Sequence, residues 1–161
     1  MKTIYSILPL IIIWLLSSCY APHLTVKNKS NENITGDDFY KSVLSMSTSE
    51  REHKAIEAIF NGNIPSFLKK FSTIKTDTII EKKRYRMKLF VSPDYISIGN
   101  NGHFARIPLT PSSAQIIADS FHCFLPTKKI VDLIYQQAKV KLEPVPMYAF
   151  RDSTVTMYQH N

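Results

Sequence analysis

Three hydrophobic patterns follow one another along this chain of 161 residues. An almost unbroken apolar run from Ile7 to Leu16 comes first. Apolar residues then recur every three or four positions between about 37 and 71, which is the spacing of one helix face, and helical spacing returns after about 110. Between these regions the period falls to two, as in a strand. The order predicts an α+β fold, with helices before and after a small antiparallel sheet of three to four strands at about 77–109.

Residues typical of helix N-caps place the helix starts. Asp37 or Asp38 is predicted to cap a helix that ends near 46, and Ser49 is predicted to cap a second helix that ends at about 60. Thr110 followed by proline begins a third helix, and Thr127 caps a fourth. This last helix is predicted to bury the apolar side chains Ile130, Val131, Ile134, Tyr135 and Ala138.

The strand over 82–91 alternates between a basic face and an apolar face. Its basic face carries Lys82, Arg84, Arg86 and Lys88. The opposite face carries Tyr85, Met87 and Leu89, which are expected to point into the core. A turn at 92–94 and a hairpin loop at 99–102 then lead to two short strands in the same sheet.

The apolar run ends in Leu16-Ser17-Ser18-Cys19, after the single positive charge of Lys2. This tetrapeptide resembles the lipobox of bacterial lipoproteins, in which cleavage precedes a cysteine that becomes acylated by fatty acids such as palmitate. A membrane-spanning helix needs about 20 apolar residues, more than this run supplies. A cleaved signal that releases a soluble protein is the third alternative. The resemblance implies a signal peptide at 1–18 and an exported protein anchored by Cys19 to the periplasmic face of a membrane.

The remaining chain divides into three parts. Residues 19–36 are rich in polar residues without periodicity, and they are predicted to form a flexible tether. Residues 37–146 contain all the periodic segments and are predicted to form one globular domain. Residues 147–161 are expected to be a C-terminal tail.

Composition excludes several kinds of enzyme. Only four glycines occur in the chain, so there is no glycine-rich phosphate loop, and HExxH, G-x-S-x-G and CxxC are absent. Whether the protein is an enzyme stays open. With Cys19 acylated, Cys123 is left alone and no disulfide can form within the chain.

Cys123 is the first candidate for chemistry, as a thiolate nucleophile with a histidine as its base. The histidines considered are His122, His103 and His160. The alternative is that Cys123 is a small buried hydrophobic residue between two helices. The same four residues lack the spacing of a metal site, so we predict no metal and no cofactor. Asp119 and Asp132, on consecutive helices, are a third candidate, as an acid–base pair. A structural role, in a salt bridge or a helix cap, is the favoured interpretation of these two carboxylates.

The basic residues Lys82, Arg84, Arg86 and Lys88 are a candidate site for an anionic envelope component such as phospholipid. The alternative is a solvated face, because an amphipathic strand needs no partner for its charges. No pattern typical of nucleic-acid binding is present, and no nucleic-acid partner is expected.

Residues of about 50–146 resemble an exported bacterial family of largely uncharacterised proteins. Its marks here are Thr110-Pro111-x-x-Ala114-Gln115-x-x-Ala118-Asp119 and Leu125-Pro126-Thr127-x-Lys129-Ile130-Val131-Asp132. The resemblance implies no activity and transfers no functional residue. Members continue beyond the equivalent of His160, which implies that this chain is a shortened member.

These observations predict a membrane-anchored bacterial envelope lipoprotein that serves as a binding or structural module. The alternative is a cell-envelope hydrolase, or a shortened fragment of one, with Cys123 and a histidine as its catalytic groups.

Overall fold

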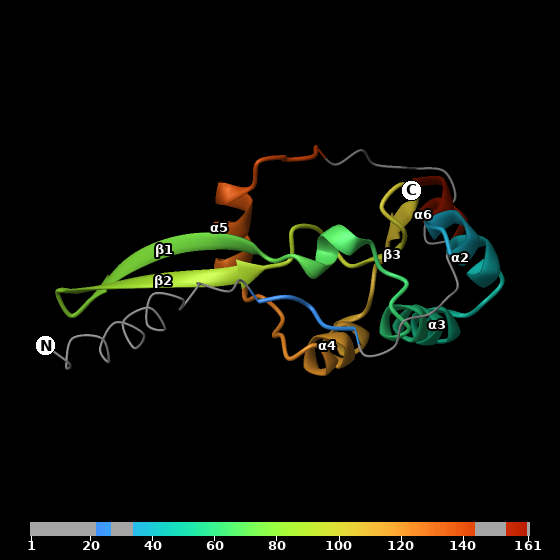
Figure 1. The fold of residues 1–161 in the computed structure, drawn as a ribbon, viewed down its shortest axis with the longest axis horizontal. Helices are drawn as coiled ribbons and strands as arrows, with labels where there is room; N and C mark the ends of the chain where they lie inside the picture. The colour runs from blue at the N-terminus through green and yellow to red at the C-terminus, as the bar shows by residue number, and fades with distance from the viewer. Residues whose placement is uncertain (1–21, 27–33, 144–153, 161) are drawn as a thin grey trace, which may run out of the picture.

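The computed structural model describes residues 22–26, 34–143 and 154–160, and it has the predicted α+β class (Figure 1). The predicted signal peptide, Cys19 and much of the predicted tether lie outside the described residues. The elements before the sheets are α2 (Gly36–Val43), α3 (Thr48–Phe60) and the 3-10 helix η1 (Ser66–Lys69). The strands are β1 (Ser72–Ile80), β2 (Lys83–Val91), β3 (Ser97–Gly99) and β4 (Phe104–Arg106). The chain continues through α4 (Pro111–Ser120), α5 (Lys128–Gln137) and α6 (Thr154–His160).

The first two helices begin earlier than predicted, because each starts in a capping box. Thr35 caps α2 and exchanges hydrogen bonds with Asp38, so Asp38 is the third residue of the helix and not its cap. Ser47, not Ser49, caps α3 in the same way with Glu50. In both boxes a hydroxyl and a carboxylate three residues later satisfy backbone N–H groups that the first turn leaves unpaired.

The described strands form two separate two-stranded sheets rather than one sheet of three or four strands. β2 pairs antiparallel with β1, from Ser72 opposite Val91 to Ile80 opposite Lys83. β3 pairs only with β4. The tight turn of the first hairpin consists of Glu81 and Lys82, both with positive φ, as a type I′ turn requires.

The core lies between α2, α3, α4 and the β3–β4 hairpin. Its fully buried apolar residues include Val43, Ile59, Ile98 and Ala105. The N-terminus of α2 packs directly on β4, because Gly36 has no side chain there: a Cβ at this position would lie 2.4 Å from the backbone nitrogen of Ala105. The Tyr40 hydroxyl fixes the same contact by donating a hydrogen bond of 2.8 Å to the carbonyl oxygen of Arg106.

The β1–β2 hairpin, residues 72–91, extends away from this core, and we call it the arm. Figure 1 shows it reaching outward on the side opposite to α2 and α6. Only Ile74, near its base, is buried in either strand. The prediction that Tyr85 and Met87 point into the core is therefore wrong, because both side chains are 46% exposed. Leu89, closer to the base, is half-buried.

Helix α5 lies beside β1 (Figure 1). The Gln137 side chain pairs with the outer edge of β1, accepting a hydrogen bond from the backbone N–H of Lys75 and donating one to its carbonyl oxygen. None of the residues of α5 is buried, and Val131 and Tyr135 are exposed. The predicted burial of Val131 and Tyr135 is therefore wrong, while Ile130 and Ile134 are half-buried, so the apolar face of α5 is covered only in part.

Part of the predicted C-terminal tail is helical. Helix α6 packs against α2, and Tyr158 contacts the core. Arg51 of α3 donates a hydrogen bond of 2.6 Å to the Thr154 hydroxyl at the start of α6. Residues 154–160 thus pack against the folded domain.

Candidate functional site

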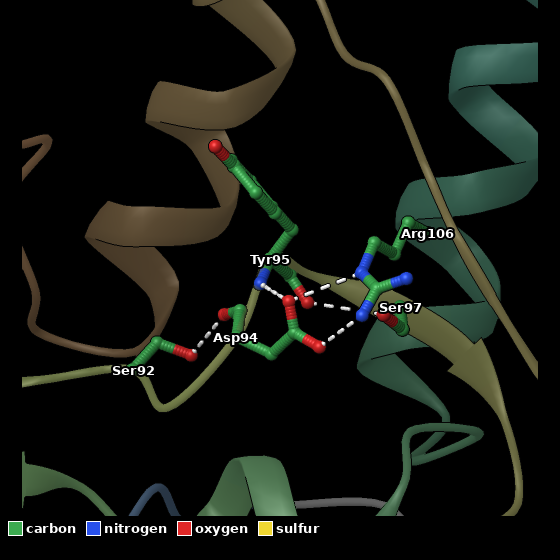
Figure 2. A network of polar contacts seen from close by, with 5 residues as sticks. All are labelled: Ser92, Asp94, Tyr95, Ser97 and Arg106. Carbon is green, nitrogen blue, oxygen red and sulfur yellow. Dashed lines mark hydrogen bonds and ion pairs between the residues drawn. The ribbon is translucent and has the colours of Figure 1, made fainter. Parts of the chain in front are cut away.

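The arm is joined to the core by a bidentate ion pair in the segment that follows β2 (Figure 2). Arg106 of β4 donates hydrogen bonds from Nε and Nη2 to the two carboxylate oxygens of Asp94, at 3.1 and 2.6 Å. Asp94 also accepts a hydrogen bond from the backbone N–H of Tyr95. Ser97, whose side chain is fully buried, donates to the Tyr95 carbonyl oxygen. These contacts fix the direction in which the chain leaves the arm.

The ion pair also keeps both partners charged. The hydrogen bond from Arg106 holds the pKa of the Asp94 carboxyl below its ordinary value, against the opposing effect of partial burial. The same hydrogen bond raises the pKa of Arg106. Two parallel hydrogen bonds between a guanidinium and a carboxylate are stronger and more directional than a single ion contact.

The N-terminal segment is held beside the residues that lead into the arm, just before β1. The backbone N–H of Leu24 donates a hydrogen bond of 3.1 Å to the carbonyl oxygen of Lys69, and His23 forms a β-bridge with Lys70. Leu24 and Val26 pack against the core. Residues 19–36 are therefore not one continuous free tether: the chain is held at His23–Leu24, beside the base of the arm.

Each face of the arm presents a distinct chemistry. The register places Arg84, Arg86 and Lys88 on the face that also carries Lys75 and Asp77. Arg84 pairs with Asp77 across the strands. The opposite face carries Thr78, Ile80, Tyr85 and Met87 near the tip, together with Lys83, which lies opposite Ile80. The predicted basic face is present for Arg84, Arg86 and Lys88, but Lys82 lies in the turn and not in the strand, and the outer half of the apolar face is exposed.

Two lysines of the arm lie over aromatic rings. The Lys83 ammonium is 5.5 Å from the centroid of Tyr85, and the Lys88 ammonium is 4.7 Å from that of Phe90. Such contacts attract the ammonium groups to the ring faces and hold the aliphatic parts of the lysines along apolar surface. The arm therefore combines exposed charge with exposed apolar surface.

Cys123 has a structural position at the end of α4. The N–H of Cys123 donates to the carbonyl of Ala118, and the N–H of His122 donates to that of Asp119, which together form a Schellman motif. His122 takes the left-handed conformation that this motif requires, with φ of 54°, and its side chain is exposed. Cys123 follows it, half-buried, with Sγ 3.4 Å from the carbonyl oxygen of Phe121.

Burial raises the pKa of the Cys123 thiol, which disfavours the thiolate that a nucleophile needs. His103 lies in the β3–β4 loop, where its carbonyl accepts hydrogen bonds from Gly36 and Asn100. His160 ends α6, and its side chain is outside what the structure describes. The geometry thus favours the structural interpretation of Cys123, and the hydrolase alternative stays a prediction.

The other proposed constellations are also not assembled among the described residues. No group of three histidine, cysteine or carboxylate side chains there could hold a metal ion. Asp119 accepts a hydrogen bond from Gln115 on its own helix, and Asp132 pairs with Lys128 at 3.8 Å. Each of the two carboxylates thus has a local structural partner.

A carboxylate that the sequence analysis did not single out joins α3 to α4. Glu52 accepts hydrogen bonds from the Thr110 N–H at 2.6 Å, the Thr110 hydroxyl at 2.8 Å and the buried Ser113 hydroxyl at 2.6 Å. Burial opposes ionisation of Glu52, but these hydrogen bonds outweigh it, and its pKa lies below the ordinary value. Since the donors are the N-cap of α4 and a residue of its first turn, the site is a helix-docking contact.

Comparison with known proteins found no match to any family, curated protein or solved structure. The resemblance to an exported bacterial family therefore stays a prediction. Among the described helices, none combines the length and the apolar composition that crossing a membrane would require.

Proposed function

We propose that this protein is a bacterial envelope lipoprotein, anchored through an acylated Cys19, whose folded domain is a binding or structural module. The observation that carries the proposal is the order of the N-terminal signals. The chain contains, in the order that export and lipidation require, a positive residue, a short apolar run, two small residues and a cysteine. Acyl chains contribute about 0.8 kcal/mol for each buried CH2, so several of them give lasting attachment.

Two features of the fold support a binding or structural role over a catalytic one. The half-buried Cys123 has a raised pKa and takes part in a helix end. The arm, by contrast, exposes both charge and apolar side chains. Contiguous exposed apolar surface is typical of protein or membrane contact sites.

The test compares two cysteine variants of the full chain in a bacterial host supplied with labelled fatty acid. Wild type and Cys123→Ala, the matched control, should incorporate label and sediment with membranes. Cys19→Ala should incorporate no label, and any of it that sediments with membranes should be released by a high-salt wash. Membrane association of Cys19→Ala that resists this wash after its signal is removed would contradict the proposal. Protease access in intact cells and in cells with a permeabilised outer membrane would test the periplasmic placement.

A further inference from the structure

We propose that the arm lies in the interface of an anionic bilayer, with Ile80, Tyr85 and Met87 toward the acyl chains and its basic side chains level with the phosphates. The bilayer is the one that holds Cys19, so the inference rests on the proposed function and adds a second membrane contact to it. Three features support this assignment, two from the described residues and one from the place of Cys19 in the sequence.

The first feature is charge. The 20 residues of the arm contain six basic and two acidic residues, so they carry a net charge of +4, against +7 for the whole chain of 161 residues. One arginine is already paired with Asp77. The other basic residues of the arm have no carboxylate among the ion pairs of the described residues: Lys75, Lys82, Lys83, Arg86 and Lys88. An anionic lipid surface attracts such a cluster within a Debye length.

The second feature is exposed apolar surface at the end of the same hairpin. Ile80 is 55% exposed and shares a face with the exposed Tyr85 and Met87, while Ile79, 69% exposed, adds apolar surface at the tip of the basic face. An element with a strongly basic face and an apolar face typically lies in the plane of the interface, with its apolar side chains at the boundary between headgroups and acyl chains. Tyrosine is enriched at that depth, and long lysine and arginine side chains extend from it to the phosphates.

The third feature is the position of the anchor. His23 is the fourth residue after Cys19, and an extended chain spans at most about 3.6 Å per residue, so the chain allows no more than about 14 Å between the two. His23 and Leu24 are bound to Lys69 and Lys70, which lead directly into β1. The base of the arm is therefore held close to the membrane that the acyl chains enter.

A second copy of the chain is a poorer occupant of this surface. Two arms brought together would each add the same net positive charge, and like charges in contact are destabilising. An anionic bilayer supplies the opposite charge and an apolar layer at the same site. We therefore assign the surface to lipid.

The test uses the mature chain with Cys19→Ser, so that binding through acyl chains cannot contribute. Trp14 is the only tryptophan of the chain and precedes Cys19, so the mature chain has none. Tyr85→Trp then gives a single fluorescent reporter on the arm, and Leu44→Trp, just after α2 at the opposite end, gives a matched control. Vesicles of phosphatidylcholine alone are compared with vesicles that also contain phosphatidylglycerol.

We expect the emission of Tyr85→Trp to shift to shorter wavelength only with phosphatidylglycerol, and that of Leu44→Trp to stay unchanged. Arg86→Glu with Lys88→Glu should weaken binding roughly 30-fold or more, since each basic residue near an anionic surface contributes about fivefold. The same charge change at Lys41 and Lys54, on the exposed faces of α2 and α3, should leave binding unchanged.

Three results would overturn the proposal. Equal binding to both kinds of vesicle would show that charge does not direct the contact. Binding without a spectral shift would show that the apolar face does not enter the interface, as for a purely electrostatic partner. A shift that grows with protein concentration in the absence of vesicles would assign the surface to a second copy. Because the chain is not lipidated in any of these measurements, none of the three results bears on the acylation of Cys19, which is tested separately.

Discussion

Replacing Glu52 by alanine should measurably loosen the contact between α3 and α4. The substitution removes the acceptor of three hydrogen bonds, two from Thr110 and one from Ser113. A hydrogen bond to a charged group contributes about 1.5–3 kcal/mol when its donor is buried. Thr110 is exposed, so water replaces Glu52 there, whereas Ser113 is only 8% exposed and its hydroxyl would lose its partner. We expect the free energy of unfolding to fall by about 2–3 kcal/mol.

The assay is urea denaturation at neutral pH, followed by far-ultraviolet circular dichroism. A double-mutant cycle with Ser113→Ala isolates the buried hydrogen bond, and we expect a coupling energy of about 1–2 kcal/mol. A loss below about 0.5 kcal/mol for Glu52→Ala, within the range of ordinary surface substitutions, would refute the reasoning. Additive effects of the two substitutions would do so as well.

The same contact should depend on pH, with a sign set by the lowered pKa of Glu52. A carboxyl whose pKa is lower in the folded chain than in the unfolded chain stabilises the fold above its unfolded pKa, which is near the ordinary value of 4.5. That contribution is lost as the pH falls through the folded pKa. The stability difference between wild type and Glu52→Gln should therefore be constant near neutral pH and shrink below about pH 4.5. A difference that grows on acidification would contradict the assignment.

Three further substitutions test positions fixed by the backbone. Cys123 should react slowly with iodoacetamide until the protein unfolds, and Cys123→Ala should lower the free energy of unfolding by about 1 kcal/mol. Rapid labelling of the native protein, at a rate that falls as a histidine is protonated, would identify Cys123 as a nucleophile instead. His122→Gly should stabilise the protein by about 0.5–1 kcal/mol in the same denaturation assay, because glycine adopts the left-handed conformation freely. Gly36→Ala should destabilise by about 1–3 kcal/mol, since the added Cβ meets the backbone of Ala105; an unchanged midpoint would exclude this close approach.

Helix starts were predictable wherever the sequence contained a complete local signal. Thr110 before Pro111 correctly placed the start of α4, and Thr127 placed that of α5. The caps of α2 and α3 were misplaced because several hydroxyl and carboxyl residues adjoin one another at both sites. The deciding signal was present as a hydroxyl residue followed three positions later by a carboxylate, at Thr35 and at Ser47.

Strand pairing and burial needed information that periodicity does not contain. The turn between β1 and β2 is Glu81-Lys82, which lacks the asparagine or glycine that usually marks a type I′ hairpin, so the pairing was not predicted. Alternation correctly placed Tyr85 opposite the basic residues, yet it could not tell whether another element covers that face. The contact of Glu52 with Ser113 joins residues 61 positions apart, and no local pattern announces it.

The amide of Gln137 has a consequence for how this protein avoids pairing with other chains in a crowded compartment. The outer edge of a lone two-stranded sheet is a template for further strands, and exposed edges promote aggregation. At Lys75 that edge is already occupied, because Gln137 reproduces the two hydrogen bonds that an added strand would make. Along β2, an identical antiparallel strand would place Arg84, Arg86 and Lys88 against the same charges. One edge is thus blocked by hydrogen bonding and the other by repulsion, so the arm can stay extended without recruiting further copies into a fibril.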